Sequence, residues 1–146
     1  LRSVGEELGR PYLLTLLAEV CIGVSRFDEV AGALEEARVA AEEREERSHE
    51  AEIYRLSGES LLSQHHSNAT ETRNCFRCAI EIARDQSARW WELRATTSLA
   101  RLLTSQGRRD EARAMLAEIY NWFTEGFDTA DLKDAKALLD RLESES

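Results

Sequence analysis

The feature that most constrains this chain is a helical rhythm of apolar residues, which recurs in seven separate segments. Within each segment the apolar residues lie three and four positions apart, the spacing that places them on one face of an α-helix. We expect helices near residues 11–24, 27–45, 50–64, 68–87, 91–106, 108–123 and 129–143. The linkers between them are short, and short linkers make consecutive helices pack antiparallel as hairpins. The sequence therefore predicts an all-α fold.

The residue types support helices and argue against a sheet. Ala, Leu, Glu, Arg and Lys make up more than half of the 146 residues, a composition typical of long packed helices. Val and Ile, which strands favour, are scarce. A chain of this length can bury the core of one domain without disulfides or metals, so residues 1–146 are expected to form a single domain. Because the chain opens with Leu1 rather than Met, we expect it to be part of a larger protein.

Three helix pairs, near residues 11–45, 50–87 and 91–123, repeat one pattern of small and large side chains. The first helix of each pair carries a small residue, which is Ala18, Gly58 or Ala100. The second helix carries four positions at matched offsets, which are Phe27, Val30, Leu34 and Ala37, then Ala69, Thr72, Phe76 and Ala79, then Arg109, Ala112, Leu116 and Ile119. A small residue lets two helices approach closely while a larger residue opposite fills the groove. The pattern predicts hairpins that repeat at intervals of 42 and then 40 residues and share one continuous core.

This order of side-chain sizes resembles the tetratricopeptide repeat. The repeats here are longer than the roughly 34 residues of that family, and the proline that commonly closes its repeats is missing. The resemblance implies a right-handed superhelical stack of three helix hairpins followed by a C-terminal capping helix. Residues 129–143, with Leu132, Ala135, Leu139 and Leu142 at helical spacing, are expected to be that cap, because a terminal repeat otherwise leaves its apolar face uncovered.

A narrower resemblance rests on five strings that follow one another along the chain. They are YRLSGESLL, CFRCAIEIAR, WELRATTSLARLL, GRRDEARAML and WFTEGFDTADLKDAKALLD. They resemble the C-terminal repeats of large bacterial predicted ATPases, in which an ATPase module precedes the repeats and is often joined to a class III adenylate/guanylate cyclase domain or a transcription-factor domain. The resemblance implies a non-catalytic regulatory arm of a signalling protein, with any ATPase or cyclase activity upstream of these residues.

Charge and motifs narrow the function classes further. The formal net charge of −9 argues against nucleic acid as a partner, because nucleic-acid binding needs a dense basic face. No apolar run approaches the roughly 20 residues needed to cross a bilayer, so no membrane partner is expected. The chain has three cysteines, an odd number that favours reduced thiols in a cytoplasm. Glycine-rich phosphate-binding motifs are absent from the sequence, and no cofactor is expected.

The first helices of the three pairs carry the candidate partner groove. In a stack of hairpins these helices line the concave side. The repeat register places nine residues there, which are Tyr12, Thr15, Glu19, Glu52, Arg55, Glu59, Arg94, Thr97 and Arg101. Together they form a surface that grades from acidic to basic and would suit a helix or an extended peptide of mixed charge. The alternative is that these are ordinary solvated positions.

Two adjacent tryptophans, Trp90 and Trp91, are candidates for self-association. Neighbouring residues on a helix point in different directions, so at least one of the two is expected to be exposed. An exposed aromatic beside arginines is a suitable anchor for a partner or for a second copy of the chain. A purely structural spacer that only forms homo-oligomers is therefore a further alternative.

The rival function is a small metal-dependent regulator or enzyme that uses His65, His66, Cys75 and Cys78. Structural zinc sites place a Cys-x-x-Cys pair on a tight turn, where both sulfurs converge on the metal. Here the pair lies inside a predicted helix, next to the core residue Phe76, so the cysteines are expected to act as small apolar side chains. We therefore expect neither a metal site nor catalytic residues in this chain.

Overall fold

The computed structural model describes residues 4–43, 49–64 and 69–144, with the backbone alone described for residues 4–13. Over these residues the chain forms seven helices and no strand. The helices are α1 (Val4–Gly23), α2 (Phe27–Glu43), α3 (Glu50–Ser63), α4 (Ala69–Asp85), α5 (Arg89–Ser105), α6 (Arg109–Tyr120) and α7 (Ala130–Ser144). The prediction of an all-α fold is confirmed.

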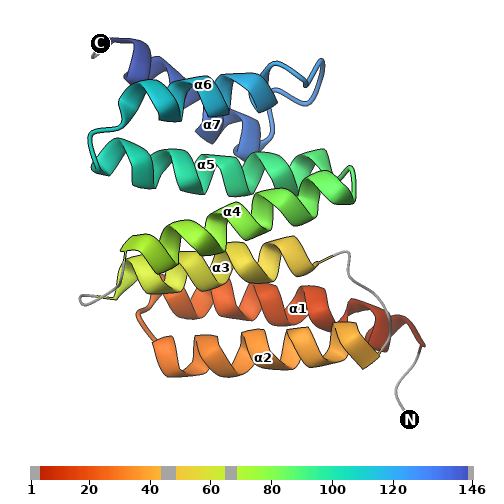
Figure 1. The fold of residues 1–146 in the computed structure, drawn as a ribbon. Helices are drawn as coiled ribbons and strands as arrows, with labels where there is room; N and C mark the ends of the chain where they lie inside the picture. Colours follow the sequence, from red (N-terminus) through yellow and green to blue (C-terminus); the bar gives the residue numbers. More distant parts are fainter. Residues whose placement is uncertain (1–3, 44–48, 65–68, 145–146) are drawn as a thin grey trace.

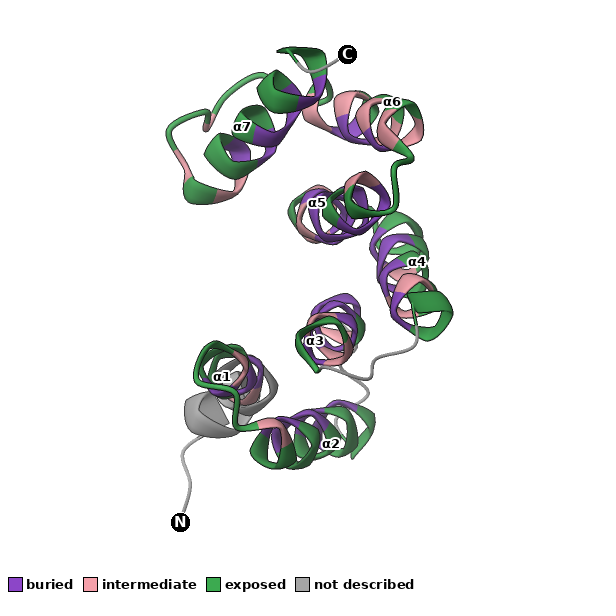
Figure 2. Cartoon of the chain, turned by 90° about the vertical axis from the view of Figure 1, so that its left-hand side faces the viewer, coloured by how far each residue is buried: buried purple, intermediate pink, exposed green. Residues whose placement is uncertain are grey.

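The helices stack along one direction as hairpins. Helix α1 packs on α2, α3 on α4 and α5 on α6, and α7 then packs against both α5 and α6 (Figure 1). Contacts also run from α1 to α3, from α3 to α5 and from α5 to α7. Seen from the side, these four helices follow one another along the inner side of an arc, and α2, α4 and α6 form its outer side (Figure 2). The arrangement is that of a helical repeat stack.

The repeated small and large positions pack as the sequence predicts. In each hairpin the small residue of the first helix is buried, and so are three of the four matched positions on the second helix. In the middle hairpin the two helices approach so closely that a Cβ atom at Gly58 would lie only 2.5 Å from Cε1 of Phe76. The first position of each matched set lies at the margin of the core, since Phe27 and Arg109 are partly exposed and Ala69 is exposed.

Three of the helix connections share one turn geometry. Ser25 (φ 61°), Ser87 (φ 55°) and Gly107 (φ 79°) each adopt a left-handed backbone conformation just after a helix. In each case the next residue donates its backbone N–H back to the preceding helix over 2.8 Å, as Ala88 does to the carbonyl of Ala83. This is the hydrogen-bond pattern that commonly terminates helices. The same compact turn therefore joins α1 to α2, α4 to α5 and α5 to α6.

Two predicted helix ends differ from the structure. Helix α1 begins at Val4, seven residues before the predicted start, so Pro11 lies inside a helix rather than in its first turn. A proline inside a helix removes one backbone hydrogen bond, but the helix propensity of single residues is only a weak guide to where a helix begins. Helix α6 ends at Tyr120, three residues earlier than predicted, before the aromatic segment that leads to α7.

The apolar core consists of two clusters rather than the one continuous core that the repeats predict. One cluster joins α1, α2 and α3 around Val30 and Leu56. The other joins α4, α5, α6 and α7 around Phe76, Leu99 and Leu116. The first cluster ends at α3, and the side of this helix that faces α5 carries charged and hydroxyl side chains instead of apolar ones.

Helix α7 caps the second cluster as expected. Leu132, Ala135, Leu139 and Leu142 are all buried against α5 and α6. Trp122 and Phe127 are about half exposed, whereas Phe123 packs against the core. The cap is therefore closed by aliphatic side chains of α7.

Candidate functional site: a charge cluster on the concave face

Arg94 on α5 connects all four helices of the concave face. Its guanidinium lies 3.4 Å from a carboxylate oxygen of Glu19 on α1, 2.9 Å from Glu52 on α3 and 3.5 Å from Asp131 on α7. The ring of Trp91 lies beneath the same guanidinium, with 5.8 Å between the guanidinium carbon and the ring centroid. The side chain of Arg94 thus contacts a residue of every other helix on the inner side of the arc.

Arg55 is the second arginine of this face and is buried on α3. Its single Nε–H is shared between the two carboxylate oxygens of Glu52, and its Nη2 donates a further hydrogen bond to Oε1 of the same carboxylate. The guanidinium also lies 3.9 Å from a carboxylate oxygen of Glu59. Burial alone would lower the pKa of Arg55, but the hydrogen bonds to Glu52 and the nearby carboxylates raise its pKa above the usual value. Arg55 therefore stays charged in the interior.

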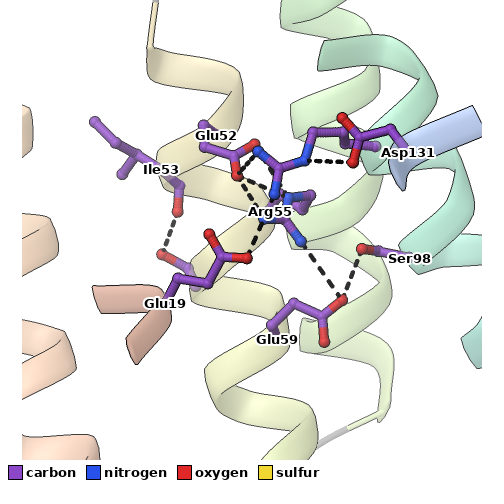
Figure 3. Close-up of polar contacts among 9 residues, drawn as sticks. Glu19, Glu52, Ile53, Arg55, Glu59, Ser98 and Asp131 are labelled. Carbon is purple, nitrogen blue, oxygen red and sulfur yellow. Dashed lines mark hydrogen bonds and ion pairs between the residues drawn. The ribbon is translucent and has the colours of Figure 1, made fainter. Parts of the chain in front are cut away.

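The two arginines share their carboxylate partners, so the contacts form one network. Figure 3 shows Glu52, Arg55 and Glu59 from α3 next to Glu19, Ser98 and Asp131 from the neighbouring inner helices (Figure 3). Ser98 on α5 donates a hydrogen bond of 2.7 Å to Glu59. Because α3 and α5 meet through these polar contacts, the network occupies the gap between the two apolar clusters on the concave side.

A small groove of about 130 Å³ lies over this network. Its lining includes two further charged residues, Arg101 on α5 and Asp134 on α7. Neither of them makes an ion pair within the part of the chain that the structure describes, whereas Arg94 and Arg55 are paired. The charged residues of this site, called here the concave charge cluster, are Glu19, Glu52, Arg55, Glu59, Arg94, Arg101, Asp131 and Asp134.

The structure brings most of the predicted groove residues together, in different states of burial. Glu52, Arg55 and Thr97 are buried, and Thr97 donates a hydrogen bond to the carbonyl oxygen of Leu93 in its own helix. Arg101 is exposed and Glu59 is half-buried. Of the other predicted groove residues, Glu19 is exposed, Arg94 is half-buried and Thr15 is buried. The side chain of Tyr12 lies outside the described residues.

Sequence reasoning missed Asp131, Asp134 and Ser98. The two aspartates lie on α7, which the sequence predicts only as a cap. Their spacing of three residues places both on one face of that helix. This spacing was the one feature of the sequence that could have predicted an acidic face on α7. Ser98 lies one position beside the predicted stripe on α5, where it faces Glu59.

Trp90 and Trp91 lie in different surroundings, as expected for neighbours on a helix. Trp90 is 42% exposed and stacks on Phe123 with 4.8 Å between ring centroids. Trp91 is half-buried and makes an edge contact with His49. Together with Arg89, Arg94 and the start of α7 they line a shallow cavity at the end of the concave face. Trp90 therefore remains available for contacts with another molecule.

The residues of the metal hypothesis lie on α4 and in the segment before it. Cys75 is half-buried and Cys78 is exposed, and burial raises the pKa of the Cys75 thiol. His65 and His66 lie outside the described residues. Among the residues that are described, no group of three or more His, Cys, Asp or Glu side chains is arranged to hold a metal ion.

The charges of the concave charge cluster are of both signs. The cluster combines three arginines with five carboxylates, and its free charges, Arg101 and Asp134, have opposite signs.

The helices described in the structure include none that is long and apolar enough to span a membrane. No family model, curated protein or solved structure matches the chain.

Proposed function

We propose that this chain is a non-catalytic helical-repeat arm that binds a protein or peptide partner on its concave face. The observation that carries the proposal is the linkage of α1, α3, α5 and α7 through Arg94. Such a face presents side chains from four helices to one partner. Concave faces of helix stacks are suited to extended binding surfaces.

The cellular setting is part of the same proposal. The resemblance of the sequence to repeats of bacterial predicted ATPases supports a place beside an ATPase or nucleotide cyclase module in a cytoplasmic signalling protein. Partner binding would then change the populations of states of the attached module, which requires that the partner bind those states with different affinity.

Arg101 and Asp134 are the side chains we propose to meet the partner first. Both line the groove, and both carry a charge that no described residue neutralises. A partner segment with an acidic and a basic residue could pair with both. Arg94, in contrast, would hold the surface in shape, because its guanidinium already contacts three carboxylates.

The test is a comparison of captured partners between surface variants. The wild-type chain, Arg101→Glu with Asp134→Lys, and a control variant are immobilised and exposed to the same native bacterial lysate. The control is Arg113→Glu on α6, which changes a partly exposed arginine on the outer row of helices. We expect partners that are lost with the first variant and retained with the control. An identical set of partners for all three proteins would rule out the concave face.

A second candidate function, self-association, is favoured by the exposure of Trp90. Trp122 nearby is 56% exposed and lies beneath the guanidinium of Arg89. Exposed aromatics beside an arginine are frequent anchors of interfaces. In this second proposal the chain is a structural spacer that forms homo-oligomers. Light scattering over a concentration series distinguishes it from a monomer that waits for a different partner.

A further inference from the structure

A second recognition surface lies at the junction of the first two hairpins, between α2 and α3. A slot of about 360 Å³ opens there, with Leu34 and Ala41 from α2 and Ile53 and Tyr54 from α3 among its lining residues. Leu34, Ala41 and Ile53 are buried, and they form an apolar floor. Tyr54 and Ala31 are exposed at the sides of the slot. The volume is at the lower end of the range of about 300–1,000 Å³ for ligand sites, and it suits one large apolar side chain.

This slot lies on the opposite side of α3 from the concave charge cluster. Successive residues of a helix are rotated by about 100°, so Ile53, Tyr54 and Ser57 point away from the side that carries Arg55 and Glu59. Figure 2 shows α2 on the outer row and α3 on the inner row at this junction (Figure 2). A partner of the slot would therefore approach a different side of α3 from a partner of the concave face.

The length of the connection explains why the slot occurs at this junction. Six residues separate α2 from α3, whereas three residues in a compact turn separate α4 from α5. At the second junction the short turn draws the hairpins together, and Ala83 and Leu93 are fully buried there. The longer connection imposes no such close approach between α2 and α3.

The rim of the slot is acidic. Glu35 and Glu42 stand along α2, and Arg38 between them contacts both carboxylates, over 2.6 Å and 2.7 Å respectively. Glu50 adds a third carboxylate from α3. Helix α2 as a whole carries six acidic residues and one arginine, a net charge of −5 within a chain of −9. The rim would attract a positively charged partner and repel an acidic one.

We propose that the α2–α3 slot binds a basic peptide segment that inserts one large apolar side chain. The apolar floor holds the inserted side chain, and lysine or arginine residues on either side of it pair with Glu35 and Glu42. The occupant is a protein segment of this chemistry. The proposal is independent of the concave face, since no residue of the concave charge cluster lines the slot.

The probe is a phage-displayed library of short peptides with a central Leu, Ile, Met or Phe and random flanking residues. We expect selection on the wild-type chain to enrich peptides with Lys or Arg in the flanks. A synthetic peptide of the enriched sequence should shift the backbone amide signals of Ala31 and Ser57 in two-dimensional NMR spectra. Absence of enrichment, or enrichment of acidic flanks, would overturn the proposal.

Two variants test the floor and the rim separately. Ala31→Trp fills the slot from an exposed position, and we expect it to weaken binding of the enriched peptide roughly tenfold or more because the apolar side chain loses its place. Glu35→Gln with Glu42→Gln removes two charges with little change of shape, and we expect weaker binding with a reduced dependence on salt. The matched control, Glu81→Gln with Glu118→Gln, removes two exposed carboxylates from α4 and α6.

The outcomes separate this slot from non-specific attraction and from the concave face. If the control weakens binding as much as the rim variant, the peptide responds only to overall charge and the proposal is wrong. Unchanged affinity for Ala31→Trp contradicts it equally. Arg101→Glu with Asp134→Lys should leave peptide binding at the slot unchanged, so the two surfaces can fail independently. Circular dichroism checks that every variant is folded, and the NMR shifts of the wild-type chain test the location without any substitution.

Discussion

We expect Gly58→Ala to destabilise the protein, although alanine is the better helix former. A Cβ atom at position 58 would lie 2.5 Å from Cε1 and 2.8 Å from Cδ1 of Phe76. The phenylalanine is fully buried, so its ring cannot turn into solvent to make room. Overpacking a core costs about 1–3 kcal/mol, and a contact this short belongs at the upper end. Alanine recovers about 1 kcal/mol of helix propensity, which leaves a net loss of about 2 kcal/mol.

Urea denaturation followed by circular dichroism measures this loss. Thermal unfolding should show a Tm that is roughly 4–8 °C lower. The matched control is Gly32→Ala in α2, where a Cβ atom meets no described atom within 4 Å. Without a steric penalty, that substitution should stabilise the protein by about 1 kcal/mol. The same change of residue is thus expected to have opposite signs at the two positions.

A double variant shows whether the loss comes from the contact with Phe76. Phe76→Leu alone should be destabilising, because it removes buried atoms of the core. Combined with Gly58→Ala, the two losses should not add, since the shorter leucine leaves room for the new methyl group. Strict additivity, or a stabilising effect of Gly58→Ala alone, would refute the reasoning that a small residue is needed where α3 meets α4.

Three other predictions follow from the turns, the cap and the exposed aromatics. Ser87→Gly should stabilise the protein by about 0.5–1 kcal/mol, because the left-handed conformation strains serine but not glycine; unchanged or lower stability in urea denaturation would contradict this. Leu132→Ala should cost about 2–5 kcal/mol in the same assay, because the leucine side chain on the capping helix is fully buried. The control Leu17→Ala, at a position that is 51% exposed, should cost less than about 1 kcal/mol. Trp90→Ser should shift any concentration-dependent oligomer towards monomer in light scattering, and an unchanged distribution would place the self-contact elsewhere.

Much of the fold could be predicted because each helix carries its own periodic signal. Six of the seven helices both begin and end within three residues of the predicted positions, and the exception is α1, whose start differs by seven residues. There, Pro11 and the glycines before it are residues that disfavour helix interiors, and local propensity points to a later start. The pairing of small and large residues at Gly58 and Phe76 could also be predicted, because it depends on neighbouring helices alone.

The sequence could predict which residues lie on the concave face, but not which of them form ion pairs with one another. The repeat register identifies Arg94, Arg55 and Glu52 as residues of one face. It cannot show that Arg94 reaches Glu19, which is 75 residues away in the sequence, because that contact depends on the curvature of the whole stack. The split of the core at α3 has the same origin. Whether the polar side of α3 faces solvent or α5 follows from how the hairpins stack, and the sequence of one helix does not contain that information.

The most direct test of the central claim is hydrogen exchange of the Arg94→Met variant compared with wild type. Methionine keeps much of the length of the side chain and removes every contact of the guanidinium. We expect the variant to lose about 1–3 kcal/mol, because Glu52 is buried but keeps Arg55 as a partner. Faster amide exchange should appear together in α1, α3 and α7, the helices that Arg94 links to α5. Exchange that changes only within α5, or equally in all seven helices, would contradict the claim that this arginine holds the concave face together.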